Sequence, residues 1–246
     1  EFHMTKFKGA NLKEADLNRA EFWQSNLTEA DLRGADLRRA SFESTTLKGA
    51  NFSGMDLTAT LFEGQGSFYK GVNLSGAKLY GMDLSDLAFY EGDFRGADLA
   101  RADLTGTQFD SVNLSGANLR GVKLNGTNFL RTNLTGAKFG AVNFTGVRLT
   151  YANLDGADLR GADLHGAIFT HQDLKGADLE GAILCNPNTS SKVYPTSNNA
   201  QCKAALLVYS SADSQGDAAA QYNLGWMYLM QWGVLQDLET SLTWFT

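Results

Sequence analysis

The sequence predicts a mainly β solenoid with four sides, followed by a short helical segment. Two observations predict the solenoid. A large apolar residue recurs at every fifth position over most of the 246-residue chain, and phenylalanines recur at every twentieth position. The helical segment is predicted because helical apolar periodicity begins near residue 202, after the five-residue spacing has ended. Repeats of fixed period indicate stacked units that pack against their neighbours.

The repeating unit reads small residue, Asn or Asp, Leu or Phe, polar residue, Gly. The large residue falls on every fifth position from Phe7 to Phe62, and again from Tyr69 to Leu184. A spacing of five matches neither a strand nor an α-helix. The large residue and the small residue two positions before it share strand parity, so both can point inward. Gly tolerates positive φ and permits a turn. We therefore expect the chain to coil around an axis.

A second spacing, of 20 residues, predicts four five-residue units in each coil. Aromatic columns inside the rod are expected at Phe22, Phe42 and Phe62, and at Phe89, Phe109, Phe129 and Phe169. An outward polar column is expected at Asn11, Asp31, Asn51, Asn73, Asp93, Asn113, Asn133, Asn153 and Asp173.

The spacing slips once, in the stretch LFEGQGSFYKGVNL at residues 61–74. The polar column steps by 22 residues here, from Asn51 to Asn73. We interpret the slip as one ordinary coil with two extra residues, bulging around Gly64–Gly66. We favour a structural insertion at a corner of the coil over a functional loop, because two extra residues are too few to form a loop that leaves the rod.

The stretches ADLRGADLRRA (30–40) and ANLDGADLRGADLHGA (152–167) resemble the pentapeptide-repeat proteins. The resemblance implies a right-handed quadrilateral β-helix with four pentapeptides per coil, giving about nine coils over residues 5–184. Residues 1–4, EFHM, look like a cloning remnant, with Met4 as the expected native start.

Residues 185–201 contain both prolines of the chain and no repeat, so we expect a loop that covers the last coil. Cys185 and Cys202 bracket this loop, and the sequence leaves open a disulfide or two thiols. A cytoplasmic location is favoured, and a periplasmic one would follow if the disulfide forms.

Residues 202–246 resemble a Sel1-type, tetratricopeptide-like helical repeat, cut off within its last helix. Helices are expected near 202–215, 217–230 and 237–245. The residues that match the repeat signature are Ala220, Leu224, Gly225, Tyr228, Gly233, Val234, Asp237 and Trp244.

The sequence offers little for catalysis, so we expect no enzyme, no cofactor and no metal. His165 and His171 fall at outward positions on different sides. Carboxylates one coil apart could share a cation, but the repeat itself explains them: Asp16, Asp36 and Asp56, and Asp158 and Asp178. A net charge of −6 argues against direct nucleic-acid binding, and the apolar runs are too short to span a membrane.

Three functions remain open: a non-enzymatic protein-interaction scaffold, which we favour, a DNA mimic that acts on a type II topoisomerase such as DNA gyrase, and a passive spacer. The mimic, implied by the resemblance, would need a strong negative surplus. Residues 1–184 carry 23 acids and 19 bases, a net charge of −4, with the two signs interleaved.

One side of the rod carries apolar residues at outward positions, which marks a candidate interaction surface. The expected partner is a protein, a second copy of the chain or the C-terminal helices. Gln172 is expected to be an anomaly, because it takes a small inward position and a buried amide needs a hydrogen-bond partner. The candidate surface comprises Phe68, Tyr90, Leu130, Tyr151 and Ile168.

Overall fold

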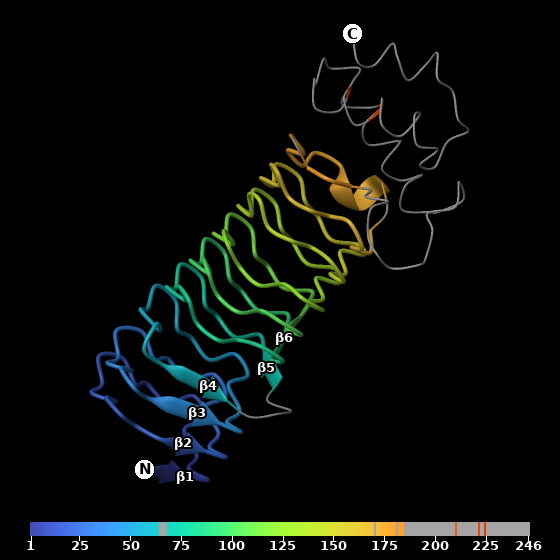
Figure 1. Cartoon of the computed structure of the whole chain (residues 1–246). Coiled ribbons are helices and arrows are strands. Elements are labelled where there is room, and N and C mark those ends of the chain that lie inside the picture. The colour runs from blue at the N-terminus through green and yellow to red at the C-terminus, as the bar shows by residue number, and fades with distance from the viewer. Residues whose placement is uncertain are drawn as a thin grey trace, which may run out of the picture.

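The chain winds into a rod of stacked coils (Figure 1). The computed structural model describes residues 1–63, 68–169, 171–180 and 182–184, together with Ser210, Gln221 and Leu224. The regular elements are short, since most of each coil is turn: β1 (Phe2–His3), β2 (Phe22–Trp23), β3 (Ser41–Glu43), β4 (Leu61–Glu63), β5 (Phe68–Lys70), β6 (Ala88–Tyr90), β7 (Gln108–Asp110) and the 3₁₀ helix η1 (His171–Leu174).

Parallel β-bridges join each coil to the next and show the period of the coil directly. Almost every bridge joins residues 20 positions apart, as in Asn11↔Asp31 and Asp16↔Asp36. Four successive units carry bridges, at residues 11, 16, 21 and 26, before the column at 11 is met again at 31. The fold is therefore a mainly β, four-sided β-helix, as the spacings of five and 20 predict.

The core is a single column of large and small side chains along the axis. From Leu17 to Leu164 every Leu or Phe at the predicted inward position is buried, and so are most of the Ala and Val two positions before them. The aromatic columns are confirmed by stacked rings: the ring centroids of Phe22 and Phe42 lie 5.0 Å apart, and those of Phe109 and Phe129 lie 5.5 Å apart. Burial on both sides of each turn fixes which side chains face inward.

Several small inward positions hold Thr or Ser instead of Ala, and each hydroxyl finds a carbonyl in the preceding coil. Thr127 Oγ1 donates to the Leu104 carbonyl at 2.7 Å, and Thr107 Oγ1 donates to the Leu84 carbonyl at 2.8 Å. Both residues are completely buried. A buried hydroxyl is tolerated because it is hydrogen-bonded, and these bonds tie adjacent coils together.

The outward Asp and Asn residues have a local structural role. Their side-chain oxygens accept the backbone N–H two residues further on, as in Asn133 Oδ1 with Thr135 N at 3.1 Å and Asp83 Oδ1 with Ser85 N at 3.0 Å. This Asx geometry holds the chain at the corner of the coil. It explains why the unit places Asp or Asn before the large residue.

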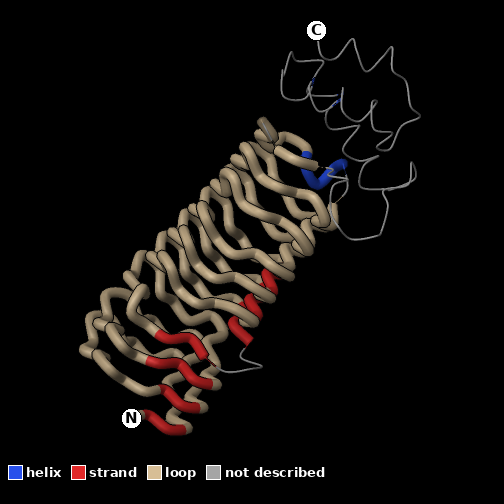
Figure 2. The backbone as a smooth tube through the Cα atoms, in the orientation of Figure 1, coloured by secondary structure: helices blue, strands red, loops and turns tan. Residues whose placement is uncertain are grey.

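The slip at 61–74 changes how the strands are joined. Bridges 22 residues apart, Asn51↔Asn73 and Asp56↔Lys78, confirm one coil with two extra residues. β4 pairs with β3 below it, whereas β5 pairs with β6, and β6 with β7. Figure 2 shows these ladders on two different flanks of the rod. The described residues show no bridge between β4 and the coil above it.

The last described coil departs from the repeat at η1. Asp173 does not continue the outward polar column: it is 5% exposed and lies in the 3₁₀ helix, which turns its carboxylate toward Tyr151. The outward position predicted for Asp173 is therefore wrong. The distortion falls on the coil that contains Gln172, whose side chain lies outside the described residues, as does that of His171.

The two ends of the chain differ in what can be described. At the N-terminal end, Phe2 continues the five-residue spacing and stacks on Phe22 with centroids 5.0 Å apart, so β1 extends the ladder into residues 1–4. At the C-terminal end, Ser210, Gln221 and Leu224 have helical backbone, and the rest of residues 202–246 lies outside the described part. No helix of the described residues is both long and apolar enough to cross a membrane.

Candidate interaction surface

The five residues of the candidate surface differ in their exposure. Tyr151 is 75% exposed and Ile168 is 49% exposed, whereas Tyr90 and Leu130 are half-buried. Phe68 contributes its backbone to β5, and its side chain lies outside the described residues. The residues follow one flank, since Ala88, Gln108, Asn128, Arg148 and Ile168 are joined in one column of bridges.

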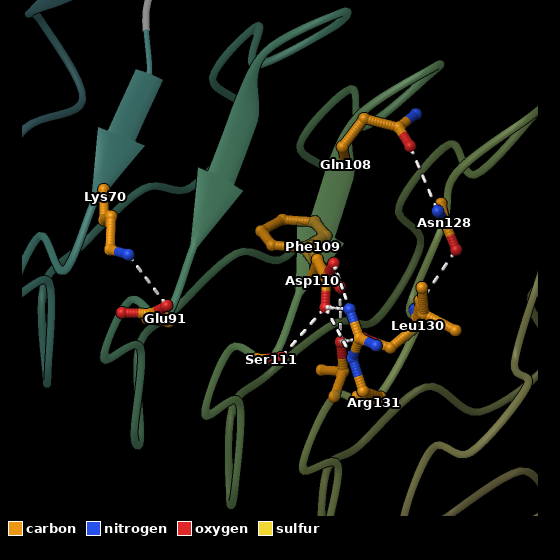
Figure 3. A network of polar contacts seen from close by, with 10 residues as sticks. Lys70, Glu91, Gln108, Phe109, Asp110, Ser111, Asn128, Leu130 and Arg131 are labelled. Carbon is orange, nitrogen blue, oxygen red and sulfur yellow. Dashed lines mark hydrogen bonds and ion pairs between the residues drawn. The ribbon is translucent and has the colours of Figure 1, made fainter.

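Polar contacts interrupt the apolar residues of this flank, as Figure 3 shows. Between the levels of Tyr90 and Leu130, the Arg131 guanidinium pairs with the Asp110 carboxylate at 2.6 Å, and Ser111 Oγ donates to the same carboxylate at 2.9 Å. Beside them, Asn128 Nδ2 donates to Gln108 Oε1 at 3.1 Å. The flank therefore presents apolar side chains separated by ion pairs and amides, a composition typical of a reversible protein interface.

Tyr151 combines high exposure with a left-handed backbone that twelve other described non-glycine residues share. It stands where most units have Gly, and its φ of 61° lies in the left-handed region. Its backbone N–H donates to Asp173 Oδ1 at 2.9 Å, which holds the corner in place. A bulky residue in this region costs conformational energy, and such residues cluster at functional sites. Among the residues of the candidate surface, Tyr151 is thus the one whose backbone conformation has a clear free-energy cost.

Charged residues outside this flank form local pairs. Asp31 with Arg33, Asp36 with Arg38, Asp93 with Arg95, and Asp158 with Arg160 share one arrangement, in which an Arg two residues on makes hydrogen bonds to both carboxylate oxygens or to one of them. Hydrogen bonding from Arg160 lowers the pKa of Asp158 to about 2. Hydrogen bonding from Arg33 likewise holds the pKa of Asp31 well below its usual range. Sequence reasoning noted the interleaved signs but missed this pairing.

The groups considered for metal or acid–base chemistry do not converge in the described part. His165 is half-buried, and its backbone N–H donates to Asp163 Oδ1 at 3.0 Å. The carboxylates one coil apart meet cations rather than one another: Lys78 pairs with Asp56 at 3.5 Å, and Arg160 lies 3.4 Å from Asp178. One group of potential ligands lies within reach of a single ion, and all three are exposed: Glu1, His3 and Glu21.

The 20-residue ladder, the buried Leu or Phe of the units between Leu17 and Leu164 and the Asx corners define a β-helical solenoid. The sequence comparison identifies its family. The model for pentapeptide repeats matches residues 5–43, 25–64, 70–106, 89–116, 113–150 and 152–186, in eight copies. The chain therefore belongs to the pentapeptide-repeat family.

Solved structures similar to this chain include those of two proteins, HetL and QnrB1. HetL from the cyanobacterium Nostoc sp. strain PCC 7120, involved in heterocyst differentiation regulation, is 27% identical, with 75% of this chain and 87% of HetL covered and a TM-score of 0.42. QnrB1, a plasmid-mediated fluoroquinolone resistance protein, is 21% identical, with 76% and 92% covered and a TM-score of 0.46. A search of curated proteins found no significant match.

Proposed function

We propose that this chain is a non-enzymatic scaffold that binds another protein through the flank carrying Tyr90, Leu130, Tyr151 and Ile168. The observation that carries the proposal is Tyr151, a large aromatic side chain that is 75% exposed. An aromatic side chain in that position contributes little to the core, and aromatic residues are frequent anchors of protein interfaces.

The surroundings of Tyr151 support a binding role. Ile168, on the same flank, is 49% exposed, which places a second apolar side chain in water. Polar groups such as the Asp110–Arg131 pair lie further along the flank and can form a polar rim. The coils themselves are held by inter-coil hydrogen bonds, so the flank is a rigid platform that loses little conformational entropy on binding.

Two variants test the scaffold. The full chain, immobilised, is compared with a Tyr151→Ser/Ile168→Ser variant for capture of proteins from an extract of the native host, and light scattering measures self-association. A matched control, Ile183→Ser, removes an exposed apolar side chain from a different column of bridges. We expect the double variant to lose a captured protein or the dimer, and the control to keep it. Equal behaviour of all three chains would exclude this flank.

The charge pattern gives the DNA-mimic alternative little support. A duplex mimic needs continuous negative potential along the rod. Here Arg33, Arg38, Arg95 and Arg160 each neutralise a carboxylate two residues before them, and Arg131 neutralises Asp110 one coil below. We therefore expect the purified chain to leave the supercoiling activity of DNA gyrase unchanged. Inhibition of gyrase by the chain, or protection of gyrase from a quinolone, would favour the DNA mimic over the scaffold.

We extend the proposal to the finer points of the architecture. About nine coils over residues 5–184, capped by 185–201, would lead into a Sel1-like helical repeat at 202–246 that offers a second binding surface. The helical backbone of Ser210, Gln221 and Leu224 is consistent with this segment. Circular dichroism of the full chain and of a variant that ends at residue 201 tests it: the difference spectrum should be helical, and a coil-like difference would refute it.

A further inference from the structure

The slip opens a cleft in the wall of the β-helix. The cleft has a volume of about 470 Å³ and lies between two successive levels of the rod. Its lower lip is formed by residues 58–62, including Leu61 and Phe62, and its upper lip by residues 81–87, including Met82 and Asp83. The volume lies within the roughly 300–1,000 Å³ range of ligand-binding sites.

The two lips lack the hydrogen bonds that join most pairs of coils, a gap that the described residues also show between Asp36 and Asp56 and between Lys123 and Asn143. One level higher, Asp103 N–H donates to the Met82 carbonyl and Leu84 N–H donates to the Asp103 carbonyl, each at 2.9 Å. The same pattern would join Asp83 N–H to the Thr60 carbonyl and Phe62 N–H to the Asp83 carbonyl. Neither bond forms, and none of the described residues of the lower lip has a backbone hydrogen bond to the upper lip. Among the described residues, both lips therefore carry backbone N–H and C=O groups that have no partner across the cleft.

Open strand edges select one chemical class of ligand. An extended peptide presents alternating N–H and C=O groups at the spacing of a strand, and can pair with an edge on either side. A lone edge is normally a hazard that proteins cover. In this chain the two edges line the same cleft, so one extended chain bound there would meet both of them.

The side chains at the cleft indicate the charge of that peptide. Asp83 and Asp86 lie on the upper lip, and neither forms an ion pair with any described residue. Apolar contact is available from Leu61, which lines the lower lip and is 52% exposed. A basic side chain would meet the carboxylates, and an apolar side chain would meet Leu61.

We propose that this cleft binds an extended segment of a partner protein, by strand addition, with a Lys or Arg beside an apolar residue. The segment bridges the open edges at Phe62 and Asp83, and its basic side chain pairs with Asp83 or Asp86. This inference rests on the proposed scaffold function and adds a second contact site, separate from the flank of Tyr151.

Three labelled hexapeptides test the proposal on the full chain by fluorescence anisotropy: Lys-Val alternating, Glu-Val alternating, and Lys-Pro alternating. The Lys-Pro peptide keeps the charge but lacks half of the strand N–H donors. We expect the Lys-Val peptide to bind at least tenfold more tightly than either of the other two. Equal binding of the Lys-Val and Lys-Pro peptides, or no binding of the Lys-Val peptide, would overturn strand addition.

Two variants locate the site. Deleting Gln65 and Gly66 returns the coil to 20 residues without changing the net charge, and should lower the affinity for the Lys-Val peptide at least tenfold. Asp83→Asn/Asp86→Asn keeps the fold of the coil and should lower the affinity for the Lys-Val peptide by a similar factor. The control Asp163→Asn changes a matched turn carboxylate on another level and should leave this affinity unchanged. Unchanged affinity in the double variant would refute the site. If the chain captures a protein through the Tyr151 flank but binds no peptide, the proposed peptide site in the cleft is refuted and the scaffold function is not.

Discussion

Replacement of Phe109 by Ala tests whether the aromatic column stabilises the rod. Phe109 is completely buried, and its ring stacks between Phe89 and Phe129 with centroids 5.5 Å away on both sides. Phe94 meets it edge-on at 5.7 Å. Truncating a buried Phe costs about 3–5 kcal/mol, a total that includes the ~0.5–1.5 kcal/mol of each lost ring pair. Because neighbouring coils relax only partly, we expect about 4–5 kcal/mol for Phe109→Ala.

The assay is urea unfolding followed by far-ultraviolet circular dichroism, with the slope of the transition checked for constancy. Phe109→Leu is the matched control, because Leu occupies most inward positions of this chain and keeps much of the apolar volume; we expect it to cost less than about 1.5 kcal/mol. A cost below about 1.5 kcal/mol for Phe109→Ala, or equal costs for the two variants, would refute the stacked column.

Three further predictions concern single contacts. Thr127→Val removes the hydroxyl that bonds the Leu104 carbonyl but keeps the shape, so we expect a loss of about 1 kcal/mol by urea unfolding. Tyr151→Gly relieves a left-handed backbone that costs a non-glycine residue about 1 kcal/mol, so thermal unfolding should show equal or higher stability. Asp158→Asn keeps the turn acceptor but loses the charge. Since the pKa of Asp158 is lowered to about 2, the advantage of the wild type should be present above pH 4 and should vanish as the pH falls through 2.

Each of these has a result that contradicts it. A neutral Thr127→Val would mean that the inter-coil hydroxyl bond contributes nothing. A Tyr151→Gly variant less stable by more than 1 kcal/mol would mean that the ring packs against another part of the chain. A stability difference for Asp158→Asn that persists unchanged at pH 2 would mean that the ion pair with Arg160 is not its cause.

Most of the fold follows from spacing alone. A period of five with alternating large and small inward residues predicts a coil, and the 20-residue recurrence of Phe22, Phe42 and Phe62 predicts its four sides, because stacked rings must lie one coil apart. The inward positions were predictable because burial requires apolar side chains there. The outward Asp and Asn residues were placed correctly, but their role in holding the corners depends on backbone geometry that periodicity does not contain.

The exceptions arise where local geometry departs from the repeat. Asp173 matches the outward column in sequence, yet η1 turns it inward, and a 3₁₀ turn leaves no mark on a five-residue pattern. The slip predicted two extra residues but not the cleft, since the sequence does not say which of the four ladders absorbs them. Whether the flank of Tyr151 binds a partner remains a prediction, because exposure and strain show only that the side chain is available.

The described part of the rod is a 20-residue ladder with one 22-residue coil, beside which the bridge between Leu61 and Asp83 is missing. Disulfide trapping tests it in a background with Cys185 and Cys202 replaced by Ser. Bridged strand residues lie about 4.8 Å apart, within the range of about 4.4–6.8 Å that a disulfide requires. We predict that the pair Asn51→Cys/Asn73→Cys oxidises readily and that Leu61→Cys/Asp83→Cys does not. Failure of the first pair, or ready oxidation of the second, would contradict the account.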